Sequence, residues 1–170
     1  MLRFSCEKAL LQGAVNTASR AVAAKSSIPA LEGILLEGGD TLTLSGYNMQ
    51  TGIRTKFTAE VEESGELVVN ARLIGEILRR LPDDVVTFTA DDKFLIHLSC
   101  GDADFDIMGL SAADFPELPE VEEKYAVQIA EKTLKSMIQQ TSFAVSTNEA
   151  RPVHMGSLFE VSAEGLTVVS

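Results

Sequence analysis

One segment of the chain reads Leu67-Val68-Val69-Asn70-Ala71-Arg72-Leu73-Ile74-Gly75-Glu76-Ile77-Leu78-Arg79-Arg80-Leu81, and its apolar spacing changes along its length. Leu67 and Val69 alternate with other residues, as in a strand with one buried side. Apolar residues then recur at helical spacing at positions 73, 74, 77, 78 and 81. Asn70 stands where a helix N-cap belongs, and Pro82 would stop the helix. The segment therefore predicts a short strand that leads directly into an amphipathic helix.

The same strand-helix pattern occurs three times, at spacings of 63 and 60 residues. With 45% apolar residues, three apolar residues share one chosen column by chance about 0.09 of the time, the cube of 0.45. Five such columns at near-equal spacing favour a structural repeat. The columns are Phe4, Leu67 and Val127; Cys6, Val69 and Ile129; Leu11, Ile74 and Leu134; Ala14, Ile77 and Met137; and Val15, Leu78 and Ile138.

The first two copies each predict the order strand, helix, strand, strand, strand, with turn residues closing the hairpins. The third copy stops after two further strands. The expected strands are 2–6, 34–36, 41–45, 53–61, 67–69, 85–90, 94–98, 103–108, 125–129, 155–161 and 166–169, and the expected helices are 7–22, 71–81 and 131–141. The buried stripe expected in the first helix is Leu10, Leu11, Ala14, Val15 and Ala18.

A linker is expected over residues 109–123, between the second and third copies. Pro116 and Pro119 interrupt regular structure there, and acidic residues favour exposure to water. Because the third copy lacks its full set of strands, we expect unpaired sheet edges near the end of the chain. The chain is then either a fragment of a longer protein or one that borrows a strand from a neighbour.

Length and composition are those of an ordinary globular protein. A chain of 170 residues can bury about 70% of its unfolded surface. No apolar run approaches the roughly 20 residues needed to cross a bilayer. Glu7 and Lys8 interrupt the N-terminal segment, which does not resemble a signal peptide. We expect a cytoplasmic protein with no membrane partner, in which Cys6 and Cys100 are reduced, partly buried thiols.

The net charge of −11 hides an uneven distribution of basic and acidic residues. The predicted helical segments, 7–25, 71–81 and 131–141, contain eight basic and three acidic residues. The remainder contains six basic and 22 acidic residues. One explanation is that Arg20, Arg79 and Arg80 only complement helix C-termini. That explanation does not cover basic residues near helix starts, so a basic helical surface remains the alternative.

No group of residues indicates an enzyme. The motifs GxGxxG, GxxxxGK[ST] and GxSxG are absent. His97 and His154 have no Cys or acidic residue at metal-ligand spacing. The three aspartates within residues 102–106 do not make a calcium loop, because Ile107 and Ala113 stand where Gly and Glu are needed. We expect a solvated acidic strand face, with no catalytic residue, no metal and no cofactor.

Three segments together resemble the bacterial sliding-clamp family, the beta subunits of DNA polymerase III: Asn70-Ala71-Arg72 with its helix, Ser111-Ala112-Ala113-Asp114-Phe115-Pro116-Glu117-Leu118, and Arg151-Pro152-Val153-His154-Met155-Gly156. The likeness covers the whole chain. It implies an α+β DNA-clamp fold of β-α-β-β-β units with helices on one face of antiparallel sheets. It also implies a first domain over residues 1–121 and the start of a second, truncated domain over 122–170.

In that family, two three-domain subunits close head to tail into a ring around duplex DNA, with helices lining the hole. The resemblance thus implies a non-catalytic processivity factor, an accessory subunit that tethers the replicative polymerase. Basic helices facing phosphate and acidic strands facing water would explain the charge distribution. The DNA-facing residues that the resemblance implies are Lys25, Arg72, Arg79, Arg80, Lys132, Lys135, Asn148 and Arg151, with Arg20 a weaker candidate.

The resemblance also implies protein partners. A second clamp subunit would contact Ile77 and Leu81 on the helix and Phe105 and Ile107 on the last strand of the first domain, although ordinary core packing is an alternative for all four. The polymerase III catalytic subunit and the clamp loader would dock in a peptide pocket that lies mostly beyond Ser170. Of this chain, His154 would stand at its rim.

Two other hypotheses belong to different classes. The first is an acidic scaffold whose basic helices bind protein partners and no nucleic acid. The second is a hydrolase that uses the aspartates of residues 102–106. Weak, sequence-independent DNA binding would favour the clamp over the scaffold, and a divalent-dependent nuclease activity would favour the hydrolase. As a fragment, the chain should be monomeric or irregularly associated and should not be retained on circular DNA.

Overall fold

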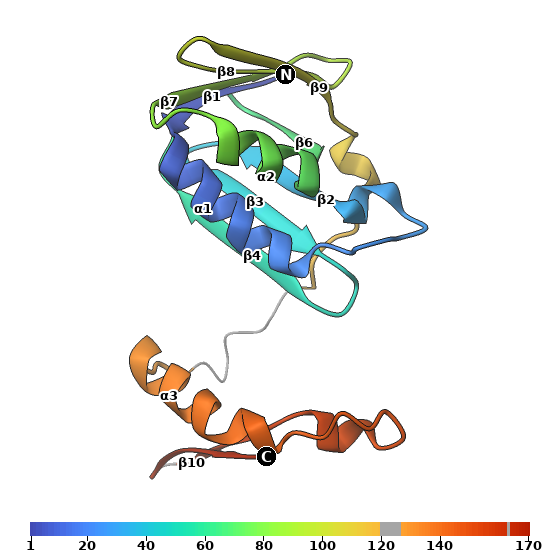
Figure 1. Cartoon of the computed structure of the whole chain (residues 1–170), viewed down its shortest axis with the longest axis vertical. Coiled ribbons are helices and arrows are strands. Elements are labelled where there is room, and N and C mark those ends of the chain that lie inside the picture. The colour runs from blue at the N-terminus through green and yellow to red at the C-terminus, as the bar shows by residue number, and fades with distance from the viewer. Residues whose placement is uncertain (120–126, 163) are drawn as a thin grey trace. The chain divides into compact units, whose positions relative to one another are not determined.

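The computed structural model describes residues 1–119, 127–162 and 164–170. The chain divides into two compact units, Met1–Pro119 and Glu120–Ser170 (Figure 1). The domain boundary predicted after residue 121 falls outside the described residues. Within the described ranges, no helix combines the length and the apolar character needed to cross a membrane.

The first copy of the repeat forms β1 (Leu2–Glu7) and α1 (Lys8–Ala18), followed by a 3-10 turn at Ser19–Ala21. The helix is therefore shorter than predicted. Its residue Leu10 is 46% exposed, so its expected place in the buried stripe is wrong. The physical reason is that the four other stripe residues already complete the spacing i, i+3, i+4, i+7. These buried residues are Leu11, Ala14, Val15 and Ala18.

The second copy forms β6 (Gly65–Asn70) and α2 (Ala71–Arg80). The side-chain oxygen of Asn70 accepts a hydrogen bond from the Leu73 backbone N–H at 2.9 Å, which confirms the predicted N-cap. Leu73 itself is 41% exposed, although it belongs to the apolar residues at helical spacing. Leu73 aligns with Leu10 of the first copy. In both copies, the apolar residue just before the buried stripe is therefore exposed to water.

The two repeats exchange their first strands, which the sequence pattern does not reveal. β1 of the first copy lies in a sheet with the three later strands of the second copy, and β6 lies in a sheet with the later strands of the first. Both sheets are antiparallel. In spatial order the sheets are β4 (Gly52–Phe57), β3 (Leu42–Tyr47), β2 (Gly33–Gly38) and β6; and β5 (Glu60–Glu63), β1, β7 (Val85–Ala90), β8 (Leu95–Cys100) and β9 (Ala103–Met108).

The segment predicted as one strand over 53–61 forms two strands, β4 and β5, that belong to different sheets. The predicted alternation is nevertheless correct, because Ile53, Phe57 and Val61 are half-buried while Arg54 and Lys56 are exposed. An extended segment can keep its period of two while it crosses from one sheet to the next. Periodicity therefore identifies the strands but not their partners.

One main core joins both sheets and both helices. Phe4 of β1 stacks on Phe88 of β7, with ring centroids 4.8 Å apart. α1 and α2 pack side by side against the four-stranded sheet (Figure 1). The same core contains the thiols of Cys6 and Cys100, which are buried and free. Burial raises the pKa of Cys6 to about 11, so this thiol stays protonated at neutral pH.

Over residues 109–119, the segment after β9 is not the exposed linker that its prolines and acidic residues predict, and residues 120–123 of the predicted linker lie outside the described residues. Leu110 pairs with Val68 of β6 through two backbone hydrogen bonds of 2.8 and 2.9 Å. Ala112–Asp114 forms a 3-10 turn, and the Phe115 side chain is only 7% exposed. Apolar residues near a proline can thus hold this segment against the four-stranded sheet, whose other face is covered by the main core.

In the second unit, α3 (Glu131–Thr141), β10 (Leu158–Ser162) and β11 (Gly165–Val169) follow the predicted order. The strand predicted over 125–129 is not confirmed, because residues 127–129 have no strand pairing, and residues 125 and 126 fall outside the described part of the chain. No residue of α3 is buried. The helix thus lacks the apolar cover that α1 and α2 have.

Candidate nucleic-acid interface

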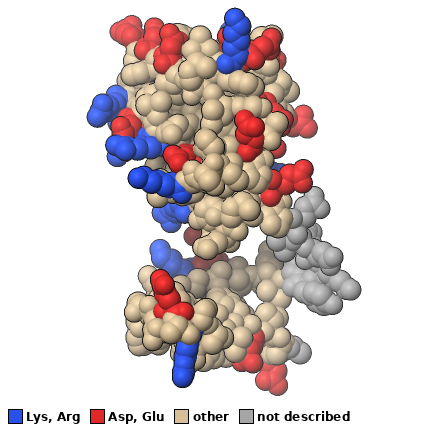
Figure 2. Space-filling model, turned by 90° about the vertical axis from the view of Figure 1, so that its right-hand side faces the viewer, with Lys and Arg blue, Asp and Glu red and all other residues tan. Residues whose placement is uncertain are grey.

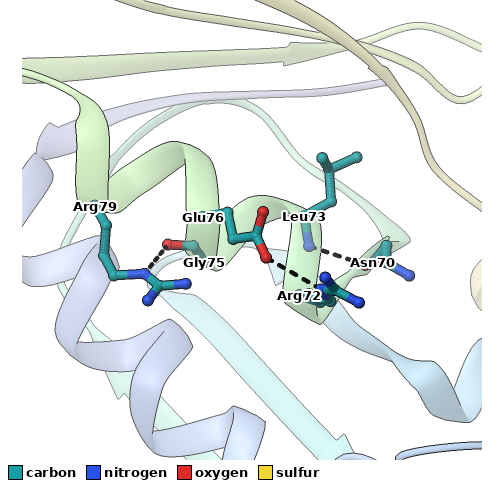
Figure 3. Close-up of polar contacts among 6 residues, drawn as sticks. All are labelled: Asn70, Arg72, Leu73, Gly75, Glu76 and Arg79. Atoms are coloured by element: carbon teal, nitrogen blue, oxygen red, sulfur yellow. Dashed lines mark hydrogen bonds and ion pairs between the residues drawn. The ribbon is translucent and has the colours of Figure 1, made fainter.

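Three arginines lie on the exposed side of α2. The Arg72 side chain is 88% exposed and pairs with Glu76 through its Nε at 3.1 Å from Oε1 (Figure 3). Two turns after Arg72, Arg79 Nε donates to the Gly75 carbonyl at 3.2 Å, and Arg80 is exposed beside it. The hydrogen bond from Arg72, with its positive charge, lowers the pKa of Glu76 below its usual value. Three guanidinium groups therefore stand against one carboxylate on this side.

The residues before α2 and after α1 form a cleft of about 800 Å³ at the N-terminus of α2. Lys25, in the loop after α1, and Arg72, in the first turn of α2, line this cleft together with Glu32. The orphan backbone N–H groups of a helix start add a partial positive charge there. The structure thus brings together two of the predicted DNA-facing residues that are far apart in sequence.

Not every basic residue of the helical segments contributes a free charge. Lys8, at the start of α1, places its Nζ 2.7 Å from Asp83 Oδ1, and its side chain is only 11% exposed. This contact lowers the pKa of Asp83 below its usual value, and the Asp83 carboxylate offsets the Lys8 charge locally. Lys8 must therefore be removed from the basic surface inferred from composition. Arg20, the weaker candidate, is exposed at the end of the first helical segment.

The exposed basic side chains of the helical segments gather on one side of the first unit, whereas Arg3, Arg54, Lys56 and Lys93 lie on strands or in a turn. In Figure 2, several Lys and Arg side chains lie along the left side of the first unit, the side that faces the viewer in Figure 1 and carries α1 and α2. Asp and Glu side chains predominate over the rest of the first unit in this view. The exposed candidates of the first unit are Lys25, Arg72, Arg79 and Arg80. The uneven charge distribution expected from the sequence is thus a spatial feature of the first unit.

The remaining DNA-facing candidates lie in the second unit. Lys132 and Lys135 are exposed on α3. Asn148 and Arg151 are exposed in the loop that precedes the 3-10 turn Pro152–Met155. The Asn148 carbonyl accepts a hydrogen bond from the Arg151 backbone N–H at 3.3 Å, which fixes the loop locally. These four residues form a second set of candidates, all within the second unit.

The four predicted subunit-contact residues differ in exposure. Ile77, Leu81 and Ile107 are buried in the main core at 7%, 5% and 8% exposure, whereas Phe105 is 36% exposed. Phe105 and Ile107 lie on β9, the outermost strand of the five-stranded sheet. Packing within the chain accounts for the burial of three of them. The edge strand and Phe105 are what remains accessible to another chain.

His154 lines a cavity of about 300 Å³ in the second unit, with Val153, Leu158 and Val169 among its neighbours. Its backbone carbonyl accepts a hydrogen bond from Ser146 N–H at 2.8 Å, and its N–H donates to the Arg151 carbonyl at 3.0 Å. The predicted pocket-rim residue therefore lies in an apolar depression.

The aspartates of β9 have a partner, His97, that was not predicted from the sequence. His97 on β8 places Nδ1 2.8 Å from Asp106 Oδ1 and Nε2 3.5 Å from Asp104 Oδ1. The hydrogen bond with Asp106, followed by the negative charges, raises the pKa of His97. The signal was available, because hairpin register places His97 opposite Asp106. All three side chains are more than half exposed, on an open sheet surface.

The two exchanged sheets, the paired helices and the basic side define an α+β clamp domain built from two repeats. The family model for the N-terminal domain of the DNA polymerase III beta subunit matches residues 2–119. The chain therefore belongs to the family of bacterial DNA polymerase III beta subunits, the beta sliding clamps.

Relatives and solved structures agree with this assignment. The chain is 32% identical to the beta sliding clamp of Bacillus subtilis over 97% of its own length and 46% of that relative. A DNA polymerase III beta subunit from Eubacterium rectale superposes with a TM-score of 0.94 at 35% identity, covering all of this chain and 47% of that one. The sliding clamp of B. subtilis gives 0.87 at 32% identity, over 93% and 44% of the two chains. The chain spans about half the length of the curated relatives it matches.

Proposed function

We propose that this chain acts in a DNA sliding clamp, as a non-catalytic, cytoplasmic processivity factor that tethers the replicative polymerase to duplex DNA. The observation that carries the proposal is the cluster of exposed cations on one side of an acidic protein. Arg72, Arg79 and Arg80 share one side of α2, and Lys25 shares a cleft with Arg72.

The physical basis is local electrostatic attraction. At physiological salt the screening length is about 8 Å, so a phosphate near α2 senses these cations far more than the distant carboxylates. Guanidinium and ammonium groups that contact phosphate oxygens read no base sequence. Such contacts hold duplex DNA and still let the protein slide along it.

Subunit assembly is proposed at the β9 edge. An outermost strand offers unpaired N–H and C=O groups to another chain, and the half-exposed ring of Phe105 lies on that strand. Ile77, Leu81 and Ile107 belong to the main core, and Ile107 lies two positions from Phe105 on the same strand, so their packing would help fix the shape of this edge. A head-to-tail contact of this kind closes a ring when the rotation between subunits allows it.

Docking of the polymerase III catalytic subunit and the clamp loader is proposed near His154. Val153, Leu158 and Val169 give the depression an apolar lining. Extended peptides commonly anchor an apolar side chain in such a pocket, with polar groups at its edge. His154 would then be one of those edge groups.

The competing proposal is an acidic scaffold that binds only proteins, and a charge-reversal experiment separates the two. The double substitution Arg72→Glu, Arg79→Glu should weaken binding of a short duplex at low salt and lower the slope of log affinity against log salt by about 1.8. The matched control is Lys56→Glu, Lys93→Glu, which changes the net charge equally at exposed sites on β4 and in the β7–β8 turn. Equal weakening by both variants, or no binding by the unsubstituted chain, would favour the scaffold.

A further inference from the structure

A second apolar cluster lies on the face of the four-stranded sheet opposite to the main core. Alternate residues of a strand point to opposite faces, so Leu67 and Val69 enter the main core while Val68 enters this cluster. Three separate parts of the chain meet there. The buried members are Ala30, Leu31, Tyr47, Val68 and Phe115, and the half-buried members are Ala23, Leu35 and Leu118.

The loop that carries Lys25 is anchored on this cluster. Across the base of the loop, the Ala23 N–H donates to the Leu31 carbonyl at 3.0 Å. Nearer the tip, the Ser26 N–H donates to Glu32 Oε1 at 3.0 Å. Ala23 and Leu31 pack in the cluster, while Lys25 is exposed between them in sequence. The base of the loop is therefore fixed by packing, and residues 23–26 of the loop line the cleft.

The segment that leaves the first unit is anchored on the same cluster. Leu110 is bonded to Val68, which lies only two residues before the N-cap Asn70. Phe115 is buried at 7% exposure, and Leu118 covers the backbone of Gly52 so closely that a Cβ there would lie 2.9 Å from Leu118 Cδ2. The exit segment thus pairs with β6, which leads into α2, and shares one apolar cluster with Ala23 and Leu31 of the loop.

We propose that Phe115 is a positioning residue for DNA binding, and that it acts through Lys25. Its ring is buried in the same apolar cluster as Leu31 and Ala23, and so would hold the loop of residues 23–31, whose Lys25 lines one cleft with Arg72. Without the ring, the loop would sample many conformations. The conformational entropy lost in ordering it would outweigh the gain from one phosphate contact, so Lys25 would no longer bind DNA. This inference rests on the proposed DNA contact of Lys25 but assigns the control of that contact to a residue that never touches DNA.

A double-mutant cycle on the full 170-residue chain tests the proposal with a short duplex at low salt. Lys25→Gln should weaken binding roughly threefold to tenfold and reduce the salt slope by about 0.9, the loss of one phosphate contact. Phe115→Ala should weaken binding to a similar degree with a similar change in slope. Because both changes remove one contact, the double variant should bind no more weakly than Lys25→Gln alone. Additive losses would overturn the proposal.

Amide hydrogen exchange supplies a readout that does not depend on DNA. Phe115→Ala should speed exchange at Ala23 and Leu31 without doing so at Leu98, and Phe115→Leu should restore protection at both loop amides. Ile96→Val, in the main core, is the control for general destabilisation and should leave the loop amides unchanged. Unchanged exchange at Ala23 in Phe115→Ala would overturn the proposal. If that variant does not fold, Leu31→Val makes the same test from the loop side.

The two assays also separate this inference from the proposed function. If Lys25→Gln binds duplex as well as the unsubstituted chain, the DNA contact of Lys25 is refuted, and the proposal about Phe115 is refuted with it. If Lys25→Gln weakens binding but Phe115→Ala leaves both binding and loop exchange unchanged, only the positioning role is refuted.

Discussion

Helices α2 and α3 share one sequence pattern and differ in what covers their apolar side. Ile74, Ile77 and Leu78 of α2 are buried between the sheets and α1. The aligned residues of α3 are half-buried or exposed, with Ile138 at 44%. Among the described residues, α3 contacts β11 and the 3-10 turn Ser142–Ala144 that directly follows α3. The pattern therefore specifies which side a helix offers, whereas neighbouring elements decide whether that side is buried.

The largest expected effect comes from truncating the same repeat position in both helices. Leu78→Ala removes a fully buried side chain and should lower the free energy of unfolding of the first unit by about 3 kcal/mol. Ile138→Ala, at the aligned position of α3, should lower that of the second unit by less than about 1 kcal/mol. Native-state amide exchange in each helix measures both. Similar losses at the two sites would show that α3 is buried in solution.

The N-caps of α2 and α3 can be changed in opposite directions, since only α2 has a side-chain cap. Asn70→Ala removes the side-chain cap of α2 and should destabilise it by about 1 kcal/mol. Ala130 holds the extended conformation of an N-cap but offers no side-chain acceptor, so Ala130→Asn should stabilise α3 by about 0.5–1 kcal/mol. Helix protection in exchange experiments should fall in one variant and rise in the other. A loss of protection in both would contradict the shared pattern.

The smallest expected effect is a pH dependence confined to the first unit. Because its carboxylate neighbours raise the pKa of His97 in the folded state, the stabilisation is fully present below the unfolded pKa and is lost as pH rises through the folded pKa. The β8–β9 hairpin should thus be more stable at pH 5.5 than at pH 8.5, and the β10–β11 hairpin serves as the internal comparison. His97→Gln should remove this difference in β8–β9 amide exchange. A difference that survives the substitution would assign it to another group.

Much of the fold could be predicted from one sequence because strand and helix periods are local properties. The three helices, the Asn70 cap and most strands follow directly from apolar spacing. Sheet membership could not be predicted, because the exchange of β1 and β6 between the two sheets depends on contacts far apart in sequence. For the same reason, local sequence places Phe115 in an exposed linker, whereas contacts distant in sequence bury it.

The candidate site was predictable in its chemistry and less so in its geometry. Exposed arginines at positions 72, 79 and 80 follow from helical spacing alone. Their neighbours do not, because the pairing of Lys8 with Asp83 joins residues 75 positions apart. The meeting of Lys25 with Arg72 likewise depends on how the loop after α1 folds back toward α2.

Amide chemical-shift mapping of the chain with a short DNA duplex at low salt tests the central claim most directly. If the basic side of the first unit contacts DNA, the amides that shift should cluster at Lys25, Arg72, Arg79 and Arg80, and the shifts should disappear as salt is raised. The chemical shifts of the amides in the acidic strand β5 should not change. Shifts centred on the sheet strands, or a spectrum that duplex DNA leaves unchanged, would contradict the claim.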